Sequence, residues 1–294
     1  MQRLWVAVVS GLALLLVISC RPGADSLSTA SGTAVPQPVH PDMILLTTTS
    51  VRDSGLLDVL VADFQRRTGY RVKPIVAGSG QVLTLGANGA GDVLLTHSPA
   101  AETAWLAAGH GLERHLIMFN DYLIVGPPDD PAGVRDSPST NAALQRVASQ
   151  RALFISRGDQ SGTHTRERQF WQQAGIVPAG SWYQESGTGQ GQSLQIASEK
   201  RGYVLTDRGT YLVQRQRLAL VPLVEHTGPE LLNIYHVLTV NPARGERVNA
   251  AGGRAFADYI VGPAAQTLIA SFGTEQYGEP VFTPAAGREV ADLP

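Results

Sequence analysis

From Asp42 onward, short apolar runs of strand length alternate with segments whose apolar residues recur at helical spacing. The run "MILLTTTS" starts apolar and ends in four hydroxyl residues, which is typical of a buried strand leading into a polar loop. The next segment places five apolar residues on one helical face before Gly69, namely Leu56, Leu57, Leu60, Val61 and Phe64. This alternation predicts an α/β fold of mixed, mostly parallel sheets flanked by helices.

The middle of the chain carries its own set of strands and helices. Strand-like runs such as "ALFIS", "RGYVLTD" and "LALVPLV" lie between two long extended segments, "FNDYLIVGP" and "LLNIYHVLTVNP". Two extended crossings favour a hinge between two lobes, with a cleft for a ligand between them. We therefore predict lobe I from residues 42–119 and 236–294, and lobe II from residues 120–235.

The first forty residues differ from the rest. Residues 1–19 carry one basic residue and a short apolar run, which predicts a secretory signal peptide rather than a membrane span. Cys20 is the only cysteine, and "VISC" resembles a bacterial lipobox, so we expect Cys20 to be lipidated; a plain anchor helix is the alternative. Residues 20–41 are rich in Ser, Gly, Pro and Ala, which predicts a flexible tether.

The charge balance limits the partners. Lys and Arg number 23 against 25 Asp and Glu, so no general basic field for nucleic acid exists. Any anion site must be local.

Three places combine a strand, a small polar loop and a helix start: "TTTS", "AGSGQ" and "SRGDQSGT". Ligands of open α/β sheets bind beyond the carboxyl ends of the strands, where hydroxyls, backbone N–H groups and helix N-termini suit an anion. The first two loops belong to lobe I and the third to lobe II, so an ion in the cleft would be held from both sides. The candidate ligand-binding residues are Thr48, Thr49, Ser50, Ser79, Gly80, Arg157, Ser161, Gly162 and Thr163.

Other chemistries lack their motifs. "GTGQG" at residues 187–191 is an incomplete dinucleotide fingerprint, and no G-x-S-x-G nucleophile elbow is present. Ser161 and His164 have no third triad partner, and the histidines at 97, 110 and 115 lack zinc-ligand spacing. We expect no catalytic residue, no cofactor and no metal ligand, so a hydrolase acting on an anion is the weaker hypothesis.

The segments "LLTTTSVRDSGLLDVLVADFQRRTG", "AGSGQVLTLGANGAGDVLLTHSP", "FNDYLIVGP", "SRGDQSGTH" and "ASEKRGYVLTDRGTYL" together resemble the tungstate-binding lipoproteins of bacterial ABC importers, over roughly residues 42–275. The resemblance implies a two-lobed periplasmic-binding-protein fold with two crossover strands. It also implies a tetrahedral oxyanion held by "TTTS" and by Arg157, with Ser161 and Thr163 beside it. The implied protein is a monomeric, extracytoplasmic, lipid-anchored receptor that serves an ABC permease. "LLTHSP" departs slightly from the family pattern.

The identity of the oxyanion stays open at this point. Tungstate and molybdate have nearly the same size and charge, and R-x-D-x-S-G-T is also similar to phosphate receptors of the same fold. Phosphate keeps a proton at neutral pH and needs an acceptor, which Asp159 would supply only if it faced the ligand. A sensor that docks to a signalling protein instead of a permease is a further alternative.

Overall fold

β1 (Asp42–Thr48) is the strand around which the first lobe is built. It pairs in parallel with β2 (Arg71–Ala77) on one side and with β3 (Val93–Thr96) on the other. Met43, Leu45 and Leu46 are all buried, because helices cover both faces of this strand. A strand that is covered on both faces needs consecutive apolar residues rather than alternating ones, which explains the run "MILL".

The computed structural model describes residues 37–225 and 228–294. The described residues fall within one contact unit, Val35–Pro294. The predicted signal peptide, Cys20 and most of the predicted tether lie outside the described residues. Within the described ranges, no helix combines the length and the apolar character needed to cross a bilayer.

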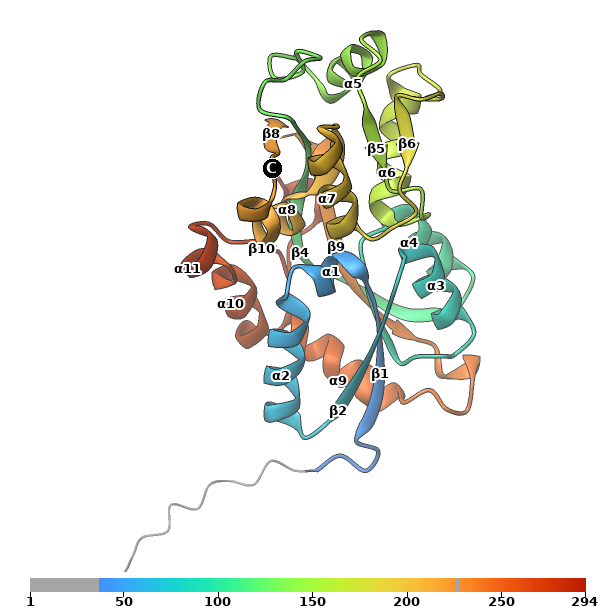
Figure 1. The fold of residues 1–294 in the computed structure, drawn as a ribbon. Coiled ribbons are helices and arrows are strands. Elements are labelled where there is room, and N and C mark those ends of the chain that lie inside the picture. The colour runs from blue at the N-terminus through green and yellow to red at the C-terminus, as the bar shows by residue number, and fades with distance from the viewer. Residues whose placement is uncertain (1–36, 226–227) are drawn as a thin grey trace, which may run out of the picture. The chain divides into compact units, whose positions relative to one another are not determined.

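Two long strands connect the lobes. β4 (Gly111–Gly126) pairs with β9 (Leu232–Val240) as far as Asp121, and from Tyr122 onward it pairs with β7 (Val204–Asp207) and β8 (Val221–Val224). The main sheet has the order β10-β4-β9-β3-β1-β2, where β10 is Thr283–Pro284. β4 therefore belongs to both lobes, and Figure 1 shows it running from one into the other.

Helices cover the sheet of lobe I on both faces (Figure 1). One face packs against α2, α9 and α10, whose bounds are Leu56–Thr68, Ala250–Val261 and Pro263–Ser271. The other packs against α3 and α4, which span Ser79–Ala87 and Pro99–Ala107. Two short helices, α1 (Thr49–Asp53) and α11 (Thr274–Tyr277), complete this part of the chain.

Lobe II is built on β7, β8 and the second part of β4, with a parallel pair of strands beside them. This pair is β5 (Phe154–Ser156) and β6 (Tyr183–Glu185), and a bridge from Phe154 to Tyr203 joins it to the chain just before β7. Its helices are α5 (Thr140–Ser149), α6 (Gly162–Gln173), α7 (Gln190–Lys200) and α8 (Arg208–Gln214). Trp171 is the largest side chain in the lobe II core.

The two-lobed α/β fold is as predicted, but the sheet contains more antiparallel pairing than predicted. Every antiparallel pair involves β4 or β9, whereas β1–β2, β1–β3 and β5–β6 are parallel. The expectation of mostly parallel sheets is corrected for this reason: β9 runs antiparallel to β3, and β4 runs antiparallel to β9, β7 and β8. Apolar periodicity identifies a strand but not its direction.

Candidate functional site

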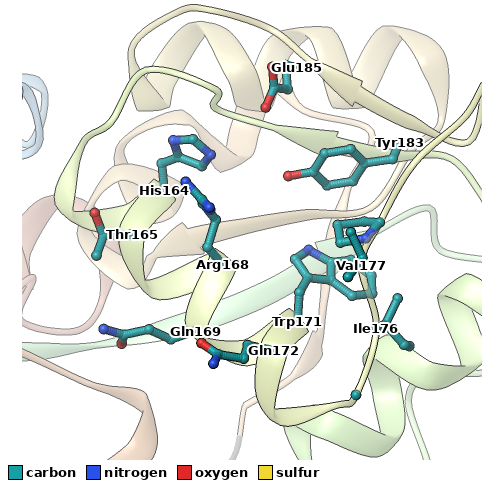
Figure 2. A pocket seen from close by; sticks show the side chains of 12 residues that line it. His164, Thr165, Arg168, Gln169, Trp171, Gln172, Ile176, Val177, Tyr183 and Glu185 are labelled. Atoms are coloured by element: carbon teal, nitrogen blue, oxygen red, sulfur yellow. The ribbon is translucent and has the colours of Figure 1, made fainter.

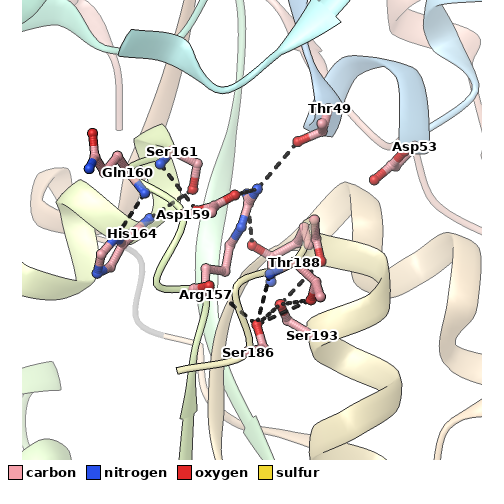
Figure 3. A network of polar contacts seen from close by, with 12 residues as sticks. Thr49, Asp53, Arg157, Asp159, Gln160, Ser161, His164, Ser186, Thr188 and Ser193 are labelled. Atoms are coloured by element: carbon pink, nitrogen blue, oxygen red, sulfur yellow. Dashed lines mark hydrogen bonds and ion pairs between the residues drawn. The ribbon is translucent and has the colours of Figure 1, made fainter. Parts of the chain in front are cut away.

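The fold brings the three predicted loops together. Nη2 of Arg157, in the third loop, lies 3.4 Å from Oγ1 of Thr49 in the first loop. A methyl group built on Gly78, in the second loop, would lie 3.7 Å from the carbonyl oxygen of Asp159. Figure 3 shows Thr49 approaching Arg157 from the neighbouring lobe. The loops therefore form one site between the lobes.

Arg157 is the buried cation of this site, with 1% of its surface exposed. Its Nη2 forms an ion pair with Oδ2 of Asp159, and its Nη1 lies 3.5 Å from Oε1 of Gln190. Its Nε has no hydrogen-bond partner within the described residues. A buried guanidinium is stable only where negative charge and acceptors surround it; Asp159 and Gln190 supply both here, and Nε remains the donor that a further acceptor could satisfy.

Buried hydroxyl groups without a partner among the described residues occur in each of the three loops. Four of the predicted residues carry a side-chain oxygen that finds no hydrogen-bond partner in the described part of the chain: Thr48, Ser50, Ser79 and Thr163. All four side chains are buried. A buried hydroxyl without a hydrogen-bond partner lowers the stability of a folded protein by about 1–3 kcal/mol. Four of them in three neighbouring loops are therefore unusual. Their chemistry fits a ligand that only accepts hydrogen bonds.

The third loop has a fixed backbone. Gly158 and Gln160 adopt left-handed conformations, with φ of 63° and 57°. Ser161 caps α6, because its Oγ accepts from the N–H of His164 at 3.2 Å, and the N–H of Gln160 donates to Nδ1 of His164 at 3.0 Å. The left-handed Gln160 is strained for a residue with a side chain, as often occurs at ligand-binding loops. The Oγ of Ser161 therefore caps α6 as an acceptor, and its hydroxyl hydrogen can still be donated to a ligand.

Asp159 faces the protein. One carboxylate oxygen binds Arg157, and the other accepts the N–H of Ser161 at 3.1 Å. A protonated anion such as phosphate would need one of these oxygens as an acceptor. Both are already engaged, so the argument from Asp159 for a phosphate site loses its support.

The glycines of the site have different roles. A methyl group built on Gly162 would lie 2.9 Å from Cε1 of His97 and 3.1 Å from Oγ of Ser79, so only glycine allows the lobes to approach here. A methyl group on Gly80 would meet nothing within 4 Å, so Gly80 would contribute through its backbone alone.

Sequence reasoning missed the start of α7. Gln190 is fully buried and accepts from Arg157, while Ser186 Oγ lies 3.3 Å from the carbonyl oxygen of Arg157 and contacts Ser193 (Figure 3). Gln190 and Ser186 therefore contact the third loop at Arg157 and help to fix its position. The glycine-rich helix start "GTGQG" could have indicated this contact with the third loop, but it was interpreted only as an incomplete dinucleotide motif.

Burial shifts the pKa values of several ionisable groups near the site. Burial lowers the pKa of His97 to about 4, and its Nδ1 lies 2.8 Å from Oδ1 of Asn233 on β9. Burial also raises the pKa of Glu167 to about 7 and raises the pKa of Asp207. In each case burial disfavours the charged form. Within the described residues, no group of three or more His, Cys, Asp and Glu side chains is placed to hold a metal ion.

A large cavity of the described structure lies elsewhere. It measures about 800 Å³ and lies beside α6, where His164, Arg168, Trp171, Tyr183 and Glu185 line it (Figure 2). None of the nine predicted site residues lines it, whereas a cation, Arg168, and a carboxylate, Glu185, both do. This cavity therefore does not coincide with the three loops that the sequence predicts to bind an anion.

The fold and the site together define a solute-binding protein of the two-lobed periplasmic-binding type. Residues 26–264 match the model of the PBP superfamily domain. The chain is 41% identical to the tungstate-binding protein TupA of Peptoclostridium acidaminophilum, over 98% of this chain and all of that one.

Two solved structures agree with this match. The tungstate ABC transporter structure from Geobacter sulfurreducens has a TM-score of 0.72 and 40% identity, and covers 79% of this chain and 98% of that one. The tungstate-binding protein from Desulfovibrio alaskensis has a TM-score of 0.70 and 38% identity, with 84% and 99% covered. The chain belongs to the TupA family of tungstate-binding proteins within the PBP superfamily. The resemblance predicted from the sequence is confirmed.

Proposed function

We propose that this protein is the extracytoplasmic substrate-binding component of an ABC importer and that it captures tungstate for delivery to the permease. The relatives it matches over most of its length carry tungstate binding in their names. The observation that carries the proposal is the buried Arg157 in one loop, together with hydroxyls in all three loops that find no partner within the described residues. They would bind a fully deprotonated tetrahedral dianion through donors alone.

The ligand set that we propose is Thr48, Thr49, Ser50, Ser79, Gly80, Arg157, Ser161, Gly162 and Thr163. Charge-assisted hydrogen bonds contribute about 1.5–3 kcal/mol each, so several of them reach the ~12 kcal/mol of a nanomolar complex. Because the donors come from both lobes, the anion favours the closed form, which a permease can recognise. Nothing in this scheme needs a nucleophile or a base, and the named relatives are binding proteins.

The proposal has three further parts: Cys20 is lipidated, the protein is a monomer, and the chain divides into two lobes. Lobe I consists of residues 42–119 and 236–294, and lobe II consists of residues 120–235. A lipid at Cys20, followed by the tether, would keep the receptor at the membrane surface. Cys20→Ala should leave tungstate affinity unchanged and release the protein from membranes or block its processing. Retention at normal size and level would instead indicate an anchor helix.

Calorimetric titration with tungstate, molybdate, sulfate and phosphate tests the ligand. We expect one tungstate per monomer, with sulfate and phosphate far weaker, and a higher unfolding temperature with tungstate. Equal stabilisation by every divalent oxyanion would contradict a selective receptor. Molybdate binding as tight as tungstate binding would make this a receptor for both ions.

A further inference from the structure

A second cavity adjoins the enclosed site. It measures about 430 Å³ and is lined by residues of α3 and α4 from lobe I, of α6 from lobe II and of β9. It shares Ser79, Gly80 and Gly162 with the proposed ligand set, whereas Thr48, Ser50, Arg157 and Thr163 do not line it. It therefore adjoins the proposed ion-binding loops and shares part of their wall, without reaching Arg157.

Three helices begin at this cavity. Gly80 lies at the start of α3, Ser98 precedes α4, and Gly162 starts α6, and all three line its wall. Neither α3 nor α4 has a side chain capping its N-terminus, although Glu102 accepts the N–H of Ser98 at 2.8 Å. The N-terminal ends of helices carry partial positive charge and free N–H groups. Their convergence makes the cavity attractive to anions.

The side chains that line the cavity add to this charge. Arg166 is the one charged residue among them, and none of the described lining residues is Asp or Glu. Its Nη1 donates to Oε1 of Gln169 at 3.0 Å and its Nη2 to the carbonyl oxygen of Glu230. Its Nε finds no partner within the described residues, and no carboxylate there forms an ion pair with Arg166. Among the described residues, no carboxylate therefore neutralises the positive charge that Arg166 brings to the cavity wall.

Ser79 connects the two spaces. Its side chain is 3% exposed, lines the cavity, and carries an Oγ without a partner in the described residues. This buried donor is an observation independent of the helix ends. An anion at Ser79 would lie between the outer cavity and the inner loops.

The cavity also has room for a hydrated ion. One water occupies about 30 Å³ in the liquid, so about 430 Å³ holds an oxyanion with part of its hydration shell. The inner loops, by contrast, are closed around their donors.

We propose that this cavity is the access route by which a tetrahedral oxyanion dianion enters the site, with Arg166 and the three helix N-termini holding the ion transiently before Ser79 passes it inward. The proposal rests on the proposed function. A group that stabilises the ion only in transit lowers the barrier in both directions, so it changes both rates and leaves the equilibrium nearly unchanged.

Stopped-flow kinetics of tungstate binding, followed by tryptophan fluorescence, test this route. In Arg166→Gln, we expect the association and dissociation rate constants to fall together by about threefold or more, with a weaker salt dependence of association. Arg168→Gln is the matched control, because Arg168 lies on the same helix but lines the large cavity of Figure 2. Its rates should equal those of the parent.

A steric variant gives a second measurement. Ala101 is an exposed residue of α4 that lines the cavity, so Ala101→Trp should narrow it without disturbing the core and should slow both rates. Parent-like rates in both Arg166→Gln and Ala101→Trp, with a normal dissociation constant, would overturn the access route alone. A parent protein that does not bind tungstate would overturn the proposed function and this route with it.

Discussion

Arg157 and Thr49 lie 108 residues apart in the chain, yet Nη2 of the arginine is 3.4 Å from Oγ1 of the threonine. The contact joins the loop after β5 in lobe II to the start of α1 in lobe I. Each residue also belongs to a loop that we expect to bind the ion. In the proposed site, closure of the lobes therefore also brings the ion-binding loops together, and the effects of substitutions should reflect this.

Arg157→Ala should weaken tungstate binding by roughly 2–5 kcal/mol, the range for removing one partner of a buried charge pair. Arg157→Lys should recover only part, because an ammonium group cannot reproduce the planar guanidinium. Titration calorimetry measures both, with thermal unfolding of the ligand-free variants as the check on folding.

Asp159→Asn should partly restore affinity to Arg157→Ala. Loss of Arg157 leaves the carboxylate of Asp159 without its ion-pair partner, next to the dianion, and the amide removes that repulsion. The measurement is a double-mutant cycle of tungstate affinity. A double variant that binds no better than Arg157→Ala would show that Asp159 does not act on the ion through its charge.

Ser50→Ala should cost about 1–3 kcal/mol of tungstate affinity, because one ligand oxygen loses its donor. Ser137→Ala is the matched control: its hydroxyl is also buried and unpartnered within the described residues, but it lies in the loop before α5. Equal affinity in both variants would remove Ser50 from the ligand set.

Gly162→Ala should weaken tungstate binding by about 1–3 kcal/mol. The added methyl would lie 2.9 Å from Cε1 of His97, which Asn233 and the stacked ring of Tyr235 hold in place. Gly80→Ala, which keeps its N–H and meets no atom, should bind nearly as the parent does. Unchanged affinity in Gly162→Ala would mean that the lobes close without this contact.

Glu167→Gln should change how stability depends on pH. Burial raises the pKa of Glu167 from 4.5 to about 7, so the folded state keeps a proton that the unfolded chain loses above pH 4.5. This group therefore lowers the free energy of unfolding as pH rises from 4.5 to about 7, by up to about 3 kcal/mol.

Glutamine keeps an acceptor for Trp171 and Tyr183 but carries no proton to lose. Relative to the parent, the variant should gain stability as pH rises through that window, as measured by denaturant unfolding. His97, with a pKa lowered to about 4, contributes the opposite slope, which the variant should reveal. A constant difference between variant and parent from pH 5 to 8 would contradict the raised pKa of Glu167.

Local patterns determined much of this protein. Consecutive apolar residues identified β1, helical spacing identified α2, and Ser161 marked the start of α6 within one residue. The three polar loops and Arg157 were also visible, because a strand followed by small polar residues and a helix start is a contiguous feature of the chain. Short elements such as α1 and β6 were missed, since a few residues carry too little periodicity.

Tertiary structure decided what the loops do. The antiparallel insertion of β4 and β9, the approach of Gln190 to Arg157 and the access cavity all depend on contacts between segments far apart in the chain. The orientation of Asp159 toward Arg157 was one of two open possibilities until the loop was folded. The sequence determined which groups were present, because residue type and local spacing are properties of contiguous chain. Only packing determined which groups meet, because burial and charge act through space.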